Sequence, residues 1–298
     1  MLGLESRVSA SNRPRIAAEP ALLVPMILLT MHMSFSNLIL THIASNSDVT
    51  IMAEFLAFFA VTGVLFSAFS NRFFFGNQDM DSDGLFETAE KSIFAFLVFL
   101  LAITLGDVRA NFSKAQDSVI NESLELRQYI YLLDLQTNTF TDQQKRQLNN
   151  YIKAVVSDEW RSLAQADPVL SADAEQAVLS LRNSVKKNVQ ESGMTPYTDK
   201  ILTSLVKLEN SRLLRYQLAT ASSPRIFWVY IAVLLLLGSA MAGRTKLDAR
   251  RAGVLGAYFG ALGMVVGLIM ILDQPFRGET SISSAPFRMV LEQIAAAR

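Results

Sequence analysis

Four charged side chains fall on helical stripes that are otherwise apolar, and they are the residues of this sequence best suited to chemistry. A step of four residues back along one stripe reaches Glu122, and a later stripe continues to Arg212 and Arg215. Counted along their helices, these residues share a level with Glu159. The pattern predicts a buried acidic–basic layer. Such a layer serves either as an ion-pair network that fixes helix register or as part of a ligand site or ion path.

The four residues belong to a polar block, 108–223, that lies between strongly apolar segments. Apolar residues recur in it at steps of three and four, which is typical of amphipathic helices. Turn signals at 137–139, Asp167-Pro168 and Ser192-Gly193 divide the block into four helices. Because short connections make consecutive helices antiparallel neighbours, we expect an up-down four-helix bundle. Its first and last helices are expected to continue into the adjoining membrane segments.

Five apolar segments surround the block, at 21–41, 51–70, 92–107, 225–242 and 253–273. A helix needs about 20 residues to cross the hydrocarbon core of a bilayer. The first segment is diluted by polar residues, so it is predicted to span the membrane, to lie at its interface or to act as an uncleaved signal anchor. The fold class is therefore all-α: an integral membrane protein with four or five transmembrane helices and an inserted up-down four-helix bundle.

This interpretation divides the chain into five parts. A basic N-terminus with the additional apolar segment occupies 1–50. Two transmembrane hairpins, 51–107 and 224–273, flank the extramembrane bundle at 108–223. A turn and an amphipathic C-terminal helix occupy 274–298, and that helix is expected to lie in the headgroup region or to cap the bundle.

The distribution of basic residues predicts the orientation in a bacterial inner or plasma membrane. Lysine and arginine in short loops favour the cytoplasmic side. The tight loop 243–252 carries Arg244, Lys246, Arg250 and Arg251, so it is predicted to be cytoplasmic. The helical bundle would then lie outside the cytoplasm.

The last apolar segment contains glycines at steps of three and four, which place them on one face of a helix: Gly253, Gly256, Gly260, Gly263 and Gly267. Glycine lets helix backbones approach closely in a bilayer. The face is predicted to pack against the segment at 225–242 or against a sister subunit; the functional alternative is a smooth pore wall or a hinge. Glu54, near one end of the segment at 51–70, is either a functional carboxylate or simply exposed at the interface.

Composition argues against several classes of activity. The 298 residues carry 27 basic and 27 acidic side chains, so no net charge favours nucleic acid as a partner. The sequence has no cysteine and only two histidines, His32 and His42, without the acidic spacing of a helical metal site. No nucleophile motif, phosphate-binding glycine loop or nucleotide motif occurs. We therefore expect no metal, no cofactor and no enzymatic activity.

A short string after the last apolar segment carries a resemblance: Leu272-Asp273-Gln274-Pro275-Phe276-Arg277-Gly278. Together with Tyr151, Glu159 and Trp160, it resembles the bacterial and plant bestrophin-like membrane family of unknown function, from about residue 50 to the end. The resemblance implies two spanning helices, a helical middle region and two more spanning helices. The first 45 residues depart from that plan. In bestrophins the helical region is cytoplasmic, which is opposite to the orientation that the loop charges predict.

Two functional interpretations follow. One is a channel or transport protein, a homo-oligomer in the lipid bilayer that provides a path for a small ion, by analogy with bestrophin anion channels. The other is a structural or sensory membrane protein without enzymatic activity, whose bundle binds a partner. The resemblance supplies no established activity to carry over to this chain.

Overall fold

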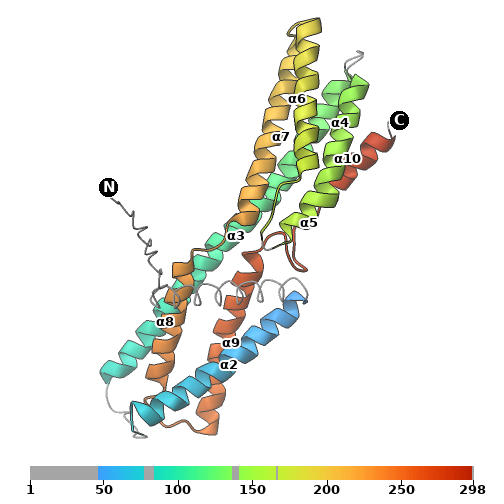
Figure 1. Cartoon of the computed structure of the whole chain (residues 1–298). Coiled ribbons are helices and arrows are strands. Elements are labelled where there is room, and N and C mark those ends of the chain that lie inside the picture. Colours follow the sequence, from blue (N-terminus) through green and yellow to red (C-terminus); the bar gives the residue numbers. More distant parts are fainter. Residues whose placement is uncertain (1–45, 77–83, 136–140, 166, 297–298) are drawn as a thin grey trace, which may run out of the picture. The chain divides into compact units, whose positions relative to one another are not determined.

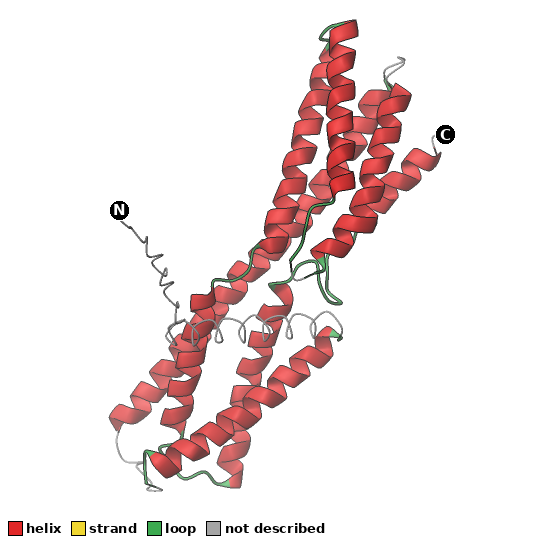
Figure 2. Ribbon diagram, in the orientation of Figure 1, coloured by secondary structure: helices red, strands yellow, loops and turns green. Residues whose placement is uncertain are grey.

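A computed structural model of the chain describes residues 46–76, 84–135, 141–165 and 167–296 (Figure 1). Every regular element in these ranges is a helix, which confirms the all-α fold class (Figure 2). The predicted segment at 21–41 and both histidines lie outside the described residues.

Four helices of the described chain are long and apolar enough to cross a membrane. They are α2 (Asp48–Phe73), the first part of α3 (Gly84–Asp134), α8 (Arg225–Ala242) and α9 (Ala249–Leu272). They coincide with the four apolar segments predicted from residue 51 onward. The chain is therefore an integral membrane protein, as the lengths of these segments indicated.

The glycines of α9 lie mainly against α2, not against the segment at 225–242 that the sequence suggested. A Cβ atom at Gly263 would come within 2.5 Å of the carbonyl oxygen of Phe55 and 2.7 Å of the Cβ of Phe59. At Gly260 and Gly267 it would meet α2 side chains at 3.2 Å. Glycine thus lets the two helix backbones approach, which supplies packing where lipid gives no hydrophobic drive. Helix spacing identifies a small-residue face but not its partner, so the sequence could not distinguish α2 from the segment at 225–242.

The bundle is built from the second half of α3 and three further helical stretches. These are α4 (Thr141–Ala154), continued by a π-helical turn (Val155–Glu159) and α5 (Trp160–Leu163), then α6 (Ala172–Ser192) and α7 (Pro196–Thr220). Around the bundle α3 packs on α7, α7 on α6, α6 on α4 and α4 on α3. This closed order is that of an up-down four-helix bundle, as predicted.

Local signals explain where the bundle helices begin and end. Ser171 accepts a hydrogen bond from the amide of Ala174 and caps α6, while Thr195 and Thr198 form a capping box at the start of α7. Gly193 adopts a positive φ of 80°, which glycine tolerates and which ends α6. These short connections keep consecutive helices side by side.

The two junctions between bundle and membrane helices differ. α3 is one continuous helix of 51 residues, as expected. The last bundle helix does not continue: α7 ends at Thr220 and α8 begins after Pro224. Proline lacks an amide hydrogen and disfavours helical geometry at the residue before it, so the helix is interrupted here. The amide and hydroxyl of Ser223 donate instead to the carboxylate of Asp273.

The C-terminal helix α10 (Ala285–Ala296) packs on α3 and α4 of the bundle. Its residues Phe287, Val290 and Ile294 are buried in the bundle core. Of the two locations expected for this amphipathic helix, the structure therefore shows the one against the bundle (Figure 1).

We predict that Gly263→Ala destabilises the protein by about 1–3 kcal/mol, because the new methyl group overlaps the Phe55 backbone. Gly253→Ala is the matched control in the same helix, since its Cβ would meet no atom within 4 Å. The control should be as stable as wild type or slightly more, because alanine favours helices. Thermal unfolding in detergent measures both; equal loss in the two variants would contradict the packing role of Gly263.

Candidate functional site

The buried centre of the bundle is an ion pair between Arg215 on α7 and Glu122 on α3. The guanidinium Nε of Arg215 donates to Glu122 at 2.8 Å, and Nη2 donates to the other oxygen of the same carboxylate at 3.3 Å. Both side chains are almost inaccessible, at 1% and 0% exposure. Two parallel hydrogen bonds fix the orientation of both groups as well as attracting the charges.

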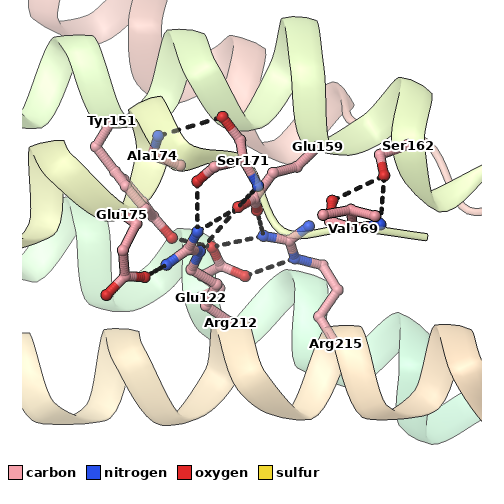
Figure 3. Close-up of polar contacts among 10 residues, drawn as sticks. All are labelled: Glu122, Tyr151, Glu159, Ser162, Val169, Ser171, Ala174, Glu175, Arg212 and Arg215. Atoms are coloured by element: carbon pink, nitrogen blue, oxygen red, sulfur yellow. Dashed lines mark hydrogen bonds and ion pairs between the residues drawn. The ribbon is translucent and has the colours of Figure 1, made fainter. Parts of the chain in front are cut away.

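Glu159 joins the two arginines of α7 to the end of the π-helical turn. Arg215 donates to one of its carboxylate oxygens at 2.8 Å, and the Nε of Arg212 donates to the other at 3.0 Å. Figure 3 shows this carboxylate between the two guanidinium groups. The amide of Ser171 also donates to it, at 3.2 Å. One carboxylate therefore connects the turn after α4, the start of α6 and α7.

Polar and aromatic neighbours complete the surroundings of the layer. The hydroxyl of Tyr151 donates to Glu122, and Arg212 donates to Glu175 at 2.6 Å. The guanidinium carbon of Arg215 lies 5.3 Å from the ring centre of Trp160 and 5.7 Å from that of Phe287. Aromatic faces at these distances attract a cation.

The pKa shifts of three members of the layer favour their charged forms: Glu159, Arg212 and Arg215. Burial raises the pKa of the Glu159 carboxyl, but the charges and hydrogen bonds of Arg215 and Arg212 outweigh burial and leave the pKa below its usual value. Burial also disfavours the charged form of Arg215, yet Glu122 and Glu159 raise its pKa. Burial next to Glu122 keeps the pKa of Tyr151 well above its usual value, so this phenol remains a hydrogen-bond donor.

A π-helical turn ends at the bridging carboxylate. The turn, Val155–Glu159, places Glu159 in the layer and is followed directly by Trp160. Such turns widen a helix locally and often occur at functional sites. The sequence predicted a helix through these residues but not the π-helical turn.

The turn after α9, residues 273–278, lies next to Trp160 and the charged layer. Phe276 packs edge-on against Trp160, with ring centres 5.7 Å apart, and the indole of Trp160 donates to the carbonyl of Ile282 at 3.2 Å. Pro275 accepts a hydrogen bond from Ile282, and Gly278 has a positive φ of 75°. Burial raises the pKa of Asp273, which accepts the hydrogen bonds of Ser223. These residues connect the end of α9 to the bundle and to the α7–α8 junction.

The structure thus brings Glu122, Glu159, Arg212 and Arg215 into one network, while the glycine face lies apart from it in the membrane helices. Glu54 lies on an exposed part of α2. Sequence reasoning missed Glu175 and the role of the Tyr151 hydroxyl. Tyr151 could have been found, because it lies two helical turns before Glu159 on the same stripe. Glu175 could not, since its side chain is 55% exposed and resembles an ordinary first-turn acid.

Chemically, the network is a set of buried ion pairs whose charged groups bind one another, and it leaves no open binding site. Its fully buried members are two cations and two carboxylates, so their charges cancel. The described residues contain no group of three or more acidic or histidine side chains arranged to hold a metal ion. What the layer can do is fix the register of α3, α4 and α7.

We predict that Arg215→Met destabilises the protein by about 3–5 kcal/mol, because Glu122 loses its charged partner inside the bundle. The control is Arg182→Met, which removes a pair with Glu209 whose arginine is 55% exposed and should cost about 0–1 kcal/mol. The double variant Glu122→Gln with Arg215→Met should lose less than the sum of its single variants. Additive losses in chemical unfolding would show that the two residues are not coupled.

Comparisons with known proteins agree with this geometry. The bestrophin-like domain matches residues 57–287, which include most of α2, the other three spanning helices and the charged layer. No curated protein matches. Two crystal structures of variants of a bacterial bestrophin homologue from Klebsiella pneumoniae superpose on the chain with TM-scores of 0.62 and 0.61. Each is 12% identical and covers 81% of this chain, and the matches span 96% and 98% of those proteins.

At this identity the crystal structures show a shared fold. The domain match is stronger evidence of descent because it extends over well over half of the chain. It also includes the Asp273-to-Gly278 turn that first suggested the resemblance. The chain therefore belongs to the bestrophin-like domain family.

Proposed function

We propose that this protein forms a channel for small anions, assembled from several copies of the chain in the membrane. Membership of the bestrophin-like family supports a channel-like membrane protein, since bestrophins are anion channels. The observation that carries the proposal is a stripe of exposed apolar residues on the bundle part of α3, away from the membrane helices.

The stripe consists of Ile120, Leu124 and Tyr131, spaced four and seven positions apart on one face of α3, and of Leu135, which directly follows the end of the helix. They are 41–62% exposed in the single chain. In the extramembrane part of a protein, apolar side chains that recur along one helix face indicate an interaction surface, and here the exposed Gln128 between Leu124 and Tyr131 interrupts them once. A neighbouring copy of the chain would cover it, so we propose a homo-oligomer.

The ion path is proposed to run between copies and not through the bundle of one chain. Inside the bundle the charged side chains themselves occupy the layer. The four side chains are between 0% and 4% exposed and make hydrogen bonds with one another. A permeating ion would have to break pairs that compensate buried charges, at a large energetic cost. A ring of copies leaves a path along its axis without disturbing these pairs.

We predict chloride efflux from liposomes that contain the purified protein, and little efflux of potassium under the same conditions. Leu124→Lys should abolish assembly and efflux together, because it places a charge in the proposed interface. Leu179→Lys, at a residue of α6 that is 40% exposed, is the control and should retain both. Mass measurement of the detergent-solubilised protein gives the number of copies. Folded, oligomeric protein in silent liposomes would favour the structural or sensory alternative.

For the orientation, we propose that the α8–α9 connection is cytoplasmic and the bundle lies outside, on the loop charges. The cytoplasmic helical region of bestrophins argues for the reverse. Both arrangements place the connection and the bundle on opposite sides, because one spanning helix, α8, separates them.

We predict that Gln143→Cys in α4 and Lys246→Cys in the α8–α9 connection react with an impermeant maleimide from opposite sides of sealed vesicles. The absence of native cysteine makes each label specific. Labelling of both from one side would contradict the four-helix topology. Labelling of Lys246→Cys from outside intact cells would reverse the proposed orientation.

A further inference from the structure

A groove of about 620 Å³ opens between α3 and α9, near the connection of α8 to α9. Its size is within the range of sites that bind small molecules. One wall is formed by Lys91, Phe94, Ala95 and Val98 of α3. These residues follow steps of three, one and three, so they share one helix face, with the only charged residue at one end.

The opposite wall has the same arrangement, with a cation at one end and apolar residues along its length. Val254, Leu255 and Tyr258 of α9 line the groove, and Arg251 precedes them by one helical turn. On both helices, then, a cation is followed by apolar residues that continue into the membrane-spanning part. The groove is thus basic at one end and apolar along its length.

The aromatic side of the groove is held in place by packing. Phe94 makes edge-to-face contacts with Tyr258, at 4.9 Å between ring centres, and with Phe259, at 5.8 Å. Its ring also lies over Gly238 of α8, where a Cβ atom would come within 2.6 Å of the ring. Since α8 and α9 both pack against Phe94 of α3, its ring is held in place before any ligand binds.

Among the described residues, the basic end has more cations than carboxylates: Lys91, Arg244, Lys246, Arg250 and Arg251 lie near Glu87, Glu90 and Asp248. Glu90 is partly buried and lies within electrostatic reach of Arg244, Arg251 and Lys91. The nearest approach of Arg244 to Glu90 is 3.8 Å, which is too long for a hydrogen bond. Arg244 is 4% exposed, and its Nε and Nη1 atoms have no hydrogen-bond partner among the described residues. Lys91 is paired with Glu87, but both side chains are more than half exposed, so that pair is weak.

We propose that the groove binds one anionic glycerophospholipid, with an acyl chain between α3 and α9 and the phosphate at Lys91 and Arg251. The apolar walls match a hydrocarbon chain, and basic pockets between spanning helices recognise anionic headgroups. A zwitterionic lipid supplies no net charge for the surplus cations of the α8–α9 connection. The acyl chain distinguishes this occupant from a free phosphate, which would gain nothing from the apolar walls.

The test measures lipid binding to the purified, delipidated full chain by native mass spectrometry, with dioleoylphosphatidylglycerol and dioleoylphosphatidylcholine as probes. Wild type should bind one phosphatidylglycerol per chain at least tenfold more tightly than phosphatidylcholine. Ala95→Trp, at an exposed position, fills the groove and should remove that bound lipid. Lys91→Gln with Arg251→Gln should abolish the preference while leaving weak binding of both lipids.

Matched controls separate this site from general lipid contact. Leu236→Trp places an indole on an exposed position of α8, outside the groove, and Arg250→Gln removes an exposed charge that does not line it. Both should bind phosphatidylglycerol as wild type does. A further control is the triple variant in which Asn replaces three aspartates of the sequence between α2 and α3: Asp79, Asp81 and Asp83. This variant should still bind phosphatidylglycerol.

Several results would overturn the proposal. Equal binding of the two lipids by wild type would remove the headgroup specificity. Unchanged binding by Ala95→Trp would place the lipid elsewhere. Competition by soluble glycerol phosphate as strong as by the intact lipid would indicate a free-phosphate site. If Ala95→Trp changed the number of copies per assembly without changing bound lipid, a second copy of the chain would be the occupant of the groove.

Discussion

The guanidinium of Arg215 connects parts of the bundle that are distant in sequence. It donates to Glu122 on α3 and to Glu159 at the end of the π-helical turn, while it belongs to α7. A charge buried this deeply requires partners, because desolvation without them is costly. The partners in turn are positioned by packing around Tyr151 and Trp160. The register of three helical stretches is therefore set by one charge that must be neutralised.

This constraint extends from the bundle to the membrane helices through direct contacts. Trp160, whose ring faces Arg215, packs against Phe276 and donates to the carbonyl of Ile282 in the segment that follows α9. At the start of that segment, Asp273 binds Ser223 between α7 and α8. The interrupted junction is thereby supported by polar contacts, while α3 crosses the other junction as a continuous helix. Bundle and membrane helices are therefore joined by an unbroken helix at one junction and by packed, hydrogen-bonded contacts at the other.

The sequence was sufficient to predict the parts of this arrangement that depend on local pattern. Charges on apolar stripes are rare, so Glu122, Arg212 and Arg215 could be identified, and counting along helices added Glu159. Contacts between distant segments could not be predicted in the same way. The break at 221–224 is stabilised by Asp273, about 50 residues away, and the partner of the α9 glycines is α2. Apolar patterns in spanning helices are similar on all faces, so they do not specify which helices meet.

The described basic residues differ in how well their charges are compensated, and this difference decides where a ligand can act. In the bundle, Arg212 and Arg215 bind carboxylates directly, so an added anion would compete with partners already in place. At the α8–α9 connection, Arg244 is equally buried but has two nitrogen atoms without hydrogen-bond partners among the described residues. A buried cation without full compensation lowers its free energy when an anion approaches. The electrostatics therefore favour anionic ligands at the membrane helices and reserve the bundle layer for holding the fold.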